Sequence, residues 1–271
     1  MRARAGAIDG KRLIRPSRSE RSFFRPLSIP RQNQKLLVVS GLLREARSAG
    51  RTGVSTLCSG GRGDWLRAAL ERIDPAPYWG VVSFGIAGAL DPVLAPGDML
   101  VGTGVWFDGE RICAANHLSA TLMDRLRARR RRVGTGLFAG AEEAVLCVAG
   151  KAALRRRTGA VAVDTESHVA ADWARRNGLP LSILRVVSDP AHRALPPLAA
   201  RAVRPDGRVD LPRVLRDLAR SPRQIGAMAH AGRDSRAAFA ALGRCQGVFD
   251  PFSPAERVSL PPPFLAITPA E

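Results

Sequence analysis

Acidic side chains stand at several places where an apolar run of the sequence ends. Asp189 closes the run LSILRVVSD, Asp164 and Glu166 follow AVAV, and Glu45 comes shortly after LLVVS. A carboxyl group there can donate a proton when protonated, and when ionised it can take up a proton or accept hydrogen bonds from hydroxyl groups. We therefore expect these carboxyl groups to converge on one pocket as acid, base and ligand holder.

Each of these carboxylates also has an ordinary structural explanation. Asp189 precedes a proline and would suit the start of a turn. Asp164 and Glu166 would suit the N-terminus of a helix that begins near Ser167, and Glu45 would suit the first turn of another helix. Their joint placement after different strands favours a functional site over these separate explanations.

Small residues follow two further apolar runs. Gly60, Gly61 and Arg62 come after VSTL, and GIAGAL comes after VVSF. Glycine lets the backbone approach a ligand closely, and the cationic turn at 60–62 is a candidate site for phosphate or for an attacking water. Both glycine clusters would also suit ordinary tight turns.

Short apolar runs alternate with helical patterns along the chain. The expected strands are 36–40, 54–57, 81–84, 98–102, 160–163 and 181–187; the expected helices are 64–72, 117–131, 168–177 and 211–243, with a break near Pro222. This alternation predicts an α/β domain with a largely parallel central sheet. Ligands of open α/β sheets bind outside the carboxyl ends of the strands, where the carboxylates above are expected.

The 271 residues divide into three parts by composition. Residues 1–34 are rich in Arg, Ser and Pro and are expected to be a disordered extension; residues 35–246 form the domain. Residues 247–271 carry six prolines, which exclude a regular helix, so we expect a tail that lies extended on the surface or hangs free. No secretory signal or membrane-spanning run is visible. The scattered cysteines and histidines predict no metal site and a cytoplasmic protein.

The net charge of +18 raises the question of a nucleic-acid partner. Only three of the 42 basic residues are lysines, so the excess of arginine is interpreted as a compositional bias of the whole chain and not as a local binding surface. Aromatic residues make up 5% of the chain and offer little for base stacking. We expect no nucleic-acid partner, while peripheral contact with an anionic membrane surface stays open.

Three segments resemble the signature of the nucleoside phosphorylase and nucleosidase superfamily. They are VVSFGIAGALDPVLAPGDMLV (81–101), AVDTESHVAA (162–171) and RVVSDPAH (185–192). The resemblance covers about residues 35–245 and implies a single three-layer α/β/α domain with a mixed, largely parallel sheet. DPAHRALPPLA and the following DGRVDLPRVLRDLARSPRQ are most similar to the hopanoid-associated branch, which is implied to remove adenine from adenosylhopane.

The resemblance also implies roles for individual residues. Asp189 would protonate the purine at N7, with Ser188 orienting it, and Glu166 would accept hydrogen bonds from the ribose hydroxyls. The remaining substrate contacts would come from Thr165, Ile86, Ala87 and Gly88, and residues 139–145 resemble the segment that contacts the purine.

The motifs leave two nucleophiles open, water and phosphate. Glu45 stands where hydrolytic members hold the attacking water, and Ser83 and Ile86 depart from the phosphorolytic pattern, which favours hydrolysis. Gly60, Gly61 and Arg62 keep phosphorolysis open. Thr165 in place of a methionine and His192 in place of an aspartate point to a pocket for a bulky 5′-substituent.

Three functions follow as alternatives. The first is release of adenine from adenosylhopane, with no cofactor unless inorganic phosphate is a co-substrate. The second is cleavage of a soluble nucleoside such as methylthioadenosine, adenosylhomocysteine or a purine nucleoside, and the third is a non-catalytic binding protein. The resemblance further implies a homo-oligomer, most simply a dimer.

Overall fold

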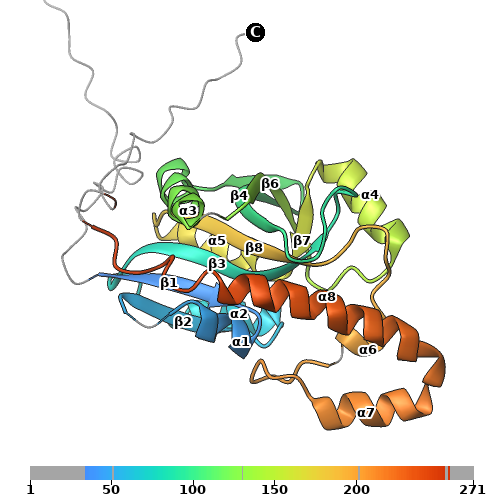
Figure 1. Ribbon diagram of the computed structural model, residues 1–271. Coiled ribbons are helices and arrows are strands. Elements are labelled where there is room, and N and C mark those ends of the chain that lie inside the picture. The colour runs from blue at the N-terminus through green and yellow to red at the C-terminus, as the bar shows by residue number, and fades with distance from the viewer. Residues whose placement is uncertain (1–33, 51, 130, 201, 254–255, 257–271) are drawn as a thin grey trace, which may run out of the picture.

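The structure, a computed structural model, describes residues 34–50, 52–129, 131–200, 202–253 and 256. Its centre is one mixed sheet of eight strands (Figure 1). The strands are β1 Lys35–Ser40, β2 Val54–Cys58, β3 Tyr78–Ala89, β4 Met99–Phe107, β5 Glu110–Cys113, β6 Val133–Gly140, β7 Ala162–Asp164 and β8 Leu181–Asp189. Parallel pairing predominates: β1 pairs in parallel with β2 and β3, β3 with β8, and β6 with β4 and β7.

The sheet folds back on itself because β8 pairs with both β3 and β4. The pairs β3–β7, β7–β6, β6–β4, β4–β8 and β8–β3 close five strands into a ring, while β1 and β2 extend from it. Because β7 runs antiparallel to β3, the expectation that all the site-bearing strands point the same way is wrong for β7. Its carboxyl end nevertheless reaches the carboxyl end of β3, since Val163 pairs with Gly88.

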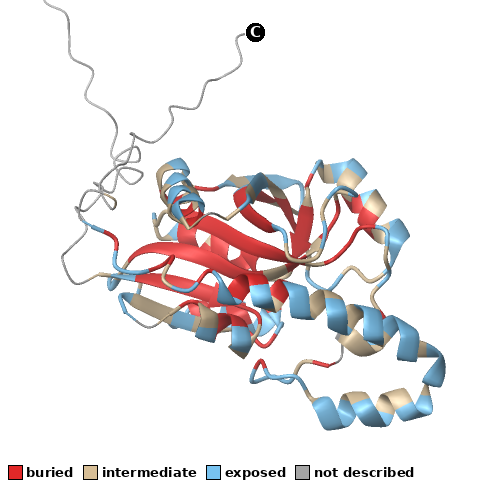
Figure 2. Cartoon of the chain, viewed as in Figure 1, coloured by how far each residue is buried: buried red, intermediate tan, exposed pale blue. Residues whose placement is uncertain are grey.

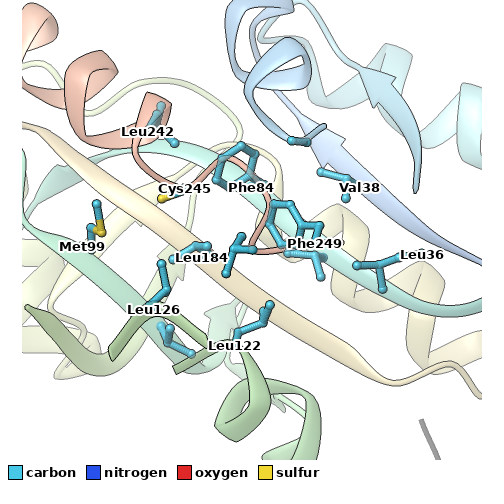
Figure 3. Close-up of a cluster of buried hydrophobic side chains, with 14 of the residues drawn as sticks. Leu36, Val38, Phe84, Met99, Leu122, Leu126, Leu184, Leu242, Cys245 and Phe249 are labelled. Atoms are coloured by element: carbon cyan, nitrogen blue, oxygen red, sulfur yellow. The ribbon is translucent and has the colours of Figure 1, made fainter. Parts of the chain in front are cut away.

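Helices cover both faces of the sheet and give the expected three-layer α/β/α architecture. They are α1 Leu43–Ser48, α2 Gly63–Leu70, α3 Asn116–Ala128, α4 Val148–Thr158, α5 Ser167–Arg176, α6 Pro197–Ala200, α7 Leu211–Arg220 and α8 Ile225–Gly243. Leucines of α3 and the end of α8 pack on one face (Figure 3), and α2 and α5 pack on the other. None of the helices in the described ranges is both long and apolar enough to cross a membrane.

Several elements differ from the expectation. The run GIAGA does not form a loop after a short strand: β3 continues through it to Ala89, because its partners β8 and β7 supply the hydrogen bonds that its glycines alone would not favour. Strand β6, whose sequence VGTGLFAG has low strand propensity, was also not expected. Nor were β5, α1, α4 or the short α6.

The chain after α8 returns to the core. Val248, Phe249 and Phe252 are buried, and Phe249 packs edge-on against Phe84 at 5.1 Å between ring centres (Figure 3). The prediction of a surface tail from residue 247 is therefore wrong for Val248, Phe249 and Phe252, because burial of two phenylalanine rings outweighs the preference of nearby prolines for extended chain. The expectations for residues 1–33 and 257–271 concern parts outside the described residues.

Candidate active site

The stretch Gly85–Gly88, near the carboxyl end of β3, is the part of the strand beside which Glu45 and Asp189 lie. A methyl group on Gly85 would lie 2.6 Å from the Glu45 carboxyl carbon, and one on Gly88 would lie 3.2 Å from Asp189 Oδ2. At about 3.3 Å per residue, the two glycines stand about 10 Å apart along the strand. Glu45 and Asp189 thus flank one short length of backbone, and the glycines leave the space that their side chains occupy.

Glu45 is held by backbone amides. Its Oε2 accepts hydrogen bonds from the N–H groups of Gly41 and Leu42 at 2.9 and 2.7 Å, and its Oε1 accepts from Ile86 at 2.8 Å. The side chain is 1% exposed. Burial raises the pKa of Glu45 to about 7, against the lowering effect of the nearby Arg185. A carboxyl group with this pKa can accept a proton near neutral pH and release it again. Glu45 also occupies the first turn of α1, so its capping role and its site position coexist.

Glu166 lies next to Glu45 in the same buried cluster. Its Oε1 accepts from the hydroxyl of Thr165 at 2.7 Å and from that of Ser59 at 3.4 Å. Burial raises the pKa of Glu166, while the positive charge of Arg185 opposes this. The side chain makes no capping hydrogen bond to α5. Asp164 caps that helix instead, since its Oδ1 accepts from the N–H groups of Glu166 and Ser167.

Arg185 is the buried cation that partly neutralises this cluster of carboxylates. It is fully buried in β8, 2.9 Å from Asp164 and 3.2 Å from Glu166, and it donates to Ser83 Oγ at 2.6 Å. Attraction to a single guanidinium offsets part of the cost of burying the neighbouring acids. The sequence signal that could have pointed to Arg185 is a charged residue inside the apolar run LSILRVV.

Replacing Arg185 by methionine should strongly destabilise the fold. The substitution leaves the buried acids Asp164, Glu166 and Glu45 without their cation, which typically costs about 3–5 kcal/mol. Urea unfolding at pH 8 measures this loss. Arg175→Met is the matched control, because Arg175 pairs with Glu110 and Asp172 at the surface, where such pairs contribute about 0–1 kcal/mol. Similar losses in the two variants would contradict the assignment of Arg185.

Asp189 ends β8 beside a bulge. Val187 pairs with Ala87 and Asp189 with Gly88, so Ser188 is an extra residue between them, and such bulges re-aim the side chains beside them. The Ser188 hydroxyl donates to Asp189 Oδ1 at 2.6 Å, and the ammonium of Lys151, from α4, donates to Oδ2. Ser188, which was predicted to orient Asp189, and Lys151, which was not predicted, are thus both hydrogen-bonded to its carboxylate.

The glycine-rich turn after β2 touches the site through Ser59, whose hydroxyl reaches Glu166. Gly60 and Gly61 both have positive φ angles, 65° and 72°. The N–H of Gly61 already donates to Gly41 O at 3.1 Å, and Arg62 pairs with Asp64 at 2.9 Å on the surface. The amide of Gly61 and the guanidinium of Arg62 thus already have partners within the chain.

Solvent access separates the predicted residues into two groups. Glu45, Glu166 and Asp189 are at most 5% exposed. Four other predicted residues are partly exposed: Ile86, Gly88, Thr165 and Ser188. A ligand would therefore meet backbone and hydroxyl groups first, with the carboxylates beneath them. His192 is exposed, and the segment 139–145 begins at the end of β6, where Gly140 pairs with Asp164.

Two recesses lie away from these carboxylates. One of about 280 Å³ is bounded by α2, α5 and β5, and one of about 630 Å³ by β4, α4 and the end of β6. Neither is lined by Asp189, Glu45 or Glu166. Glu45 and Asp189 are grouped along β3, and their convergence with Glu166 on one pocket stays a prediction.

Comparison with known proteins agrees with this architecture. Residues 78–208 match the Phosphorylase superfamily. That range includes Asp189, Glu166, Lys151 and all of β3, whereas Glu45 lies before it. A search of curated proteins finds no match at a significant level.

Solved structures extend the likeness over most of the chain. The 5′-methylthioadenosine/S-adenosylhomocysteine nucleosidase from Helicobacter pylori is 15% identical, with 78% of this chain and 97% of that chain covered and a TM-score of 0.57. Futalosine hydrolase of Helicobacter pylori gives the same values. The corresponding nucleosidase from Neisseria meningitidis is 17% identical, with 78% and 96% covered and a TM-score of 0.58. At these identities the likeness establishes the fold.

Proposed function

We propose that this chain is an enzyme that cleaves the N-ribosidic bond of a purine nucleoside by hydrolysis. The observation that carries the proposal is the pair of buried carboxyl groups, Asp189 and Glu45, at the two ends of the Gly85–Gly88 stretch of β3. The superfamily match and the nucleosidase structures with the same fold support the same reaction class.

The reaction needs a proton on the departing base and a nucleophile at the sugar. In the proposal Asp189 delivers a proton to N7 of the purine, and the C1′–N9 electron pair leaves with the base. Glu45 takes a proton from the water that attacks C1′. Glu166 accepts hydrogen bonds from the ribose hydroxyls, with Thr165 and Ser59 fixing its carboxylate. The backbone of Ile86, Ala87 and Gly88 lies beneath the nucleoside.

The direct test is incubation of the purified protein with adenosylhopane, 5′-methylthioadenosine and adenosine, with phosphate supplied and withheld. Hydrolysis predicts free adenine and an unphosphorylated sugar in both conditions. A phosphorylated sugar would instead assign the reaction to phosphorolysis and the turn at Gly60 to phosphate. No purine release from any nucleoside would remove the enzymatic proposal and leave a binding protein.

For the substrate we propose adenosylhopane, a nucleoside whose 5′ side carries a large apolar body. Apart from the resemblance at 190–224, the feature that favours a lipid is the exposed helix α7. Leu211 and Leu215 are each 59% exposed, Val209 just before the helix is 57% exposed, and Ile225 at the start of α8 is 53% exposed. Figures 1 and 2 show α7 extending away from the sheet, with its surface largely uncovered. A soluble nucleoside with a smaller 5′-substituent is the alternative substrate.

The α7 surface has the pattern of a helix that lies on a membrane. Leu211, Leu215 and Leu218 recur on one face at helical spacing, and the opposite face carries Arg213, Arg216 and Arg220. Apolar side chains combined with arginines suit an anionic lipid surface. The segment before α7 adjoins the site: the N–H of Leu43 donates to Gly207 O at 3.0 Å, and Pro205 O closely approaches Gly60. A lipid held by α7 would thus lie near Glu45 and Glu166.

Removing the apolar side chains of α7 should weaken vesicle binding. The double variant Leu211→Ser/Leu215→Ser removes two apolar side chains, and full burial of each would contribute about 1.5–3 kcal/mol to binding. We therefore expect at least about tenfold weaker binding to phosphatidylglycerol-containing vesicles. Sedimentation with vesicles measures this. Val93→Ser/Val148→Ser, at two exposed valines elsewhere, is the control and should bind as the wild type does. Equal binding of all three proteins, or equal binding to neutral vesicles, would contradict a lipid surface at α7. A change in oligomeric state without vesicle binding would assign α7 to contact between copies of the chain.

A further inference from the structure

Lys151 is a buried cation with a full set of partners. It lies in the first turn of α4 and is 1% exposed. Its ammonium donates to Asp189 Oδ2, to Pro190 O at 3.0 Å and to Arg193 O at 3.1 Å. A lysine ammonium carries three protons, so each has one acceptor. All three acceptors belong to the end of β8 and the turn that follows it.

The pairing of Lys151 with Asp189 is specific. Within the described chain, the only partners recorded for the Asp189 carboxylate are Lys151 and Ser188. The neighbouring cations face elsewhere: Arg155 pairs with Asp91 at 2.9 Å, and the guanidinium of Arg193 pairs with Asp234. A buried ion pair is costly and weak evidence for a purely stabilising role. The compact ammonium of lysine can also give up a proton, which a guanidinium does not.

An ion-paired Asp189 carries no proton for the purine. We infer that Lys151 is the proton reserve of Asp189, an inference that rests on the proposed function. As the purine base begins to leave, an Nζ–H bond of Lys151 breaks and an O–H bond forms on Asp189. That proton then passes to N7 as the C1′–N9 bond breaks. Glu45 takes one proton from the attacking water, and exchange with solvent afterwards returns one to Lys151, so the protons balance. Lys151 acts through Asp189 and is therefore a positioning residue.

The test compares two substrates with different needs for a proton. 5′-Methylthioadenosine releases adenine, which must be protonated, whereas p-nitrophenyl β-D-ribofuranoside releases a stable phenolate that needs no acid. Lys151→Met should lower kcat for 5′-methylthioadenosine by about 10²-fold, with KM nearly unchanged, and should change turnover of the nitrophenyl riboside by less than about threefold. Arg155→Met, which removes a cation one turn further along α4, is the matched control and should leave both turnovers unchanged.

A second variant guards against a folding defect. Lys151→Arg keeps the charge and the N–H donors but holds its protons, so it should retain the nitrophenyl activity and remain slow on 5′-methylthioadenosine. Equal losses on both substrates in both variants, or wild-type turnover of 5′-methylthioadenosine by either one, would overturn the inference while the proposed function stands. Wild-type protein that cleaves neither substrate would overturn both.

Discussion

Replacing Asp189 by asparagine should lower kcat for adenine release by about 10²–10⁴-fold, the range that general acid catalysis supplies. Asparagine keeps the shape of the side chain but has no acidic proton to pass on. In the wild type, hydrogen bonds from Ser188 and Lys151 hold the Asp189 carboxyl group in place for proton transfer. Steady-state kinetics with 5′-methylthioadenosine measures the effect, and KM should change much less than kcat because the contacts to the ribose remain.

The control for this variant is Asp172→Asn. Asp172 pairs with Arg175 and Arg176 on the surface of α5, so its loss should leave kcat within about threefold of the wild type. Circular dichroism establishes that both proteins are folded. If folded Asp189→Asn turned over 5′-methylthioadenosine at nearly the wild-type rate, Asp189 would not be the acid.

Loss of Glu45 should have an effect of similar size. Glu45→Gln removes the only group that the proposal assigns to the attacking water, and general base catalysis contributes about 10²–10⁴-fold. The pH dependence of kcat/KM is an independent test of Glu45 as the base. Burial raises the pKa of Glu45 to about 7, and a base must be ionised to act. The wild-type kcat/KM should therefore fall as pH drops below about 7 and level off above it.

Profiles of kcat/KM between pH 5 and 9 test this assignment. The Glu45→Gln variant should lose the rise through pH 7 together with the activity. Glu71→Gln, at an exposed glutamate that pairs with Arg176, should keep both. A wild-type profile that is flat across this range would place the catalytic base elsewhere.

The sequence predicted the fold where apolar runs were distinct. The runs LLVVS and LSILRVV correspond to β1 and β8 within one or two residues at each end. Short β-branched runs bounded by polar or glycine residues favour a strand over a helix. The glycine-rich segments were harder. β3 beyond Phe84 and all of β6 owe their strand conformation to their neighbours in the ring, and pairing between distant strands leaves little local signal.

The site was predictable in its acids and less so in their partners. Glu45 and Glu166 lie in one buried cluster, Asp189 lies beside Gly88 further along β3, and β7 brings Glu166 in by antiparallel pairing with β3. Arg185 and Lys151 were missed because their partners come from distant elements. Each left a trace in the sequence: Arg185 interrupts an apolar strand, and Lys151 is one of three lysines in an arginine-rich chain.

The most direct measurement is mass analysis of both products after incubation of the purified protein with 5′-methylthioadenosine in water enriched in heavy oxygen. The account predicts free adenine without label and a ribose product that carries one heavy oxygen atom, with no product formed by Asp189→Asn on the same time scale. A sugar product without label, or adenine release that persists in that variant, would contradict it.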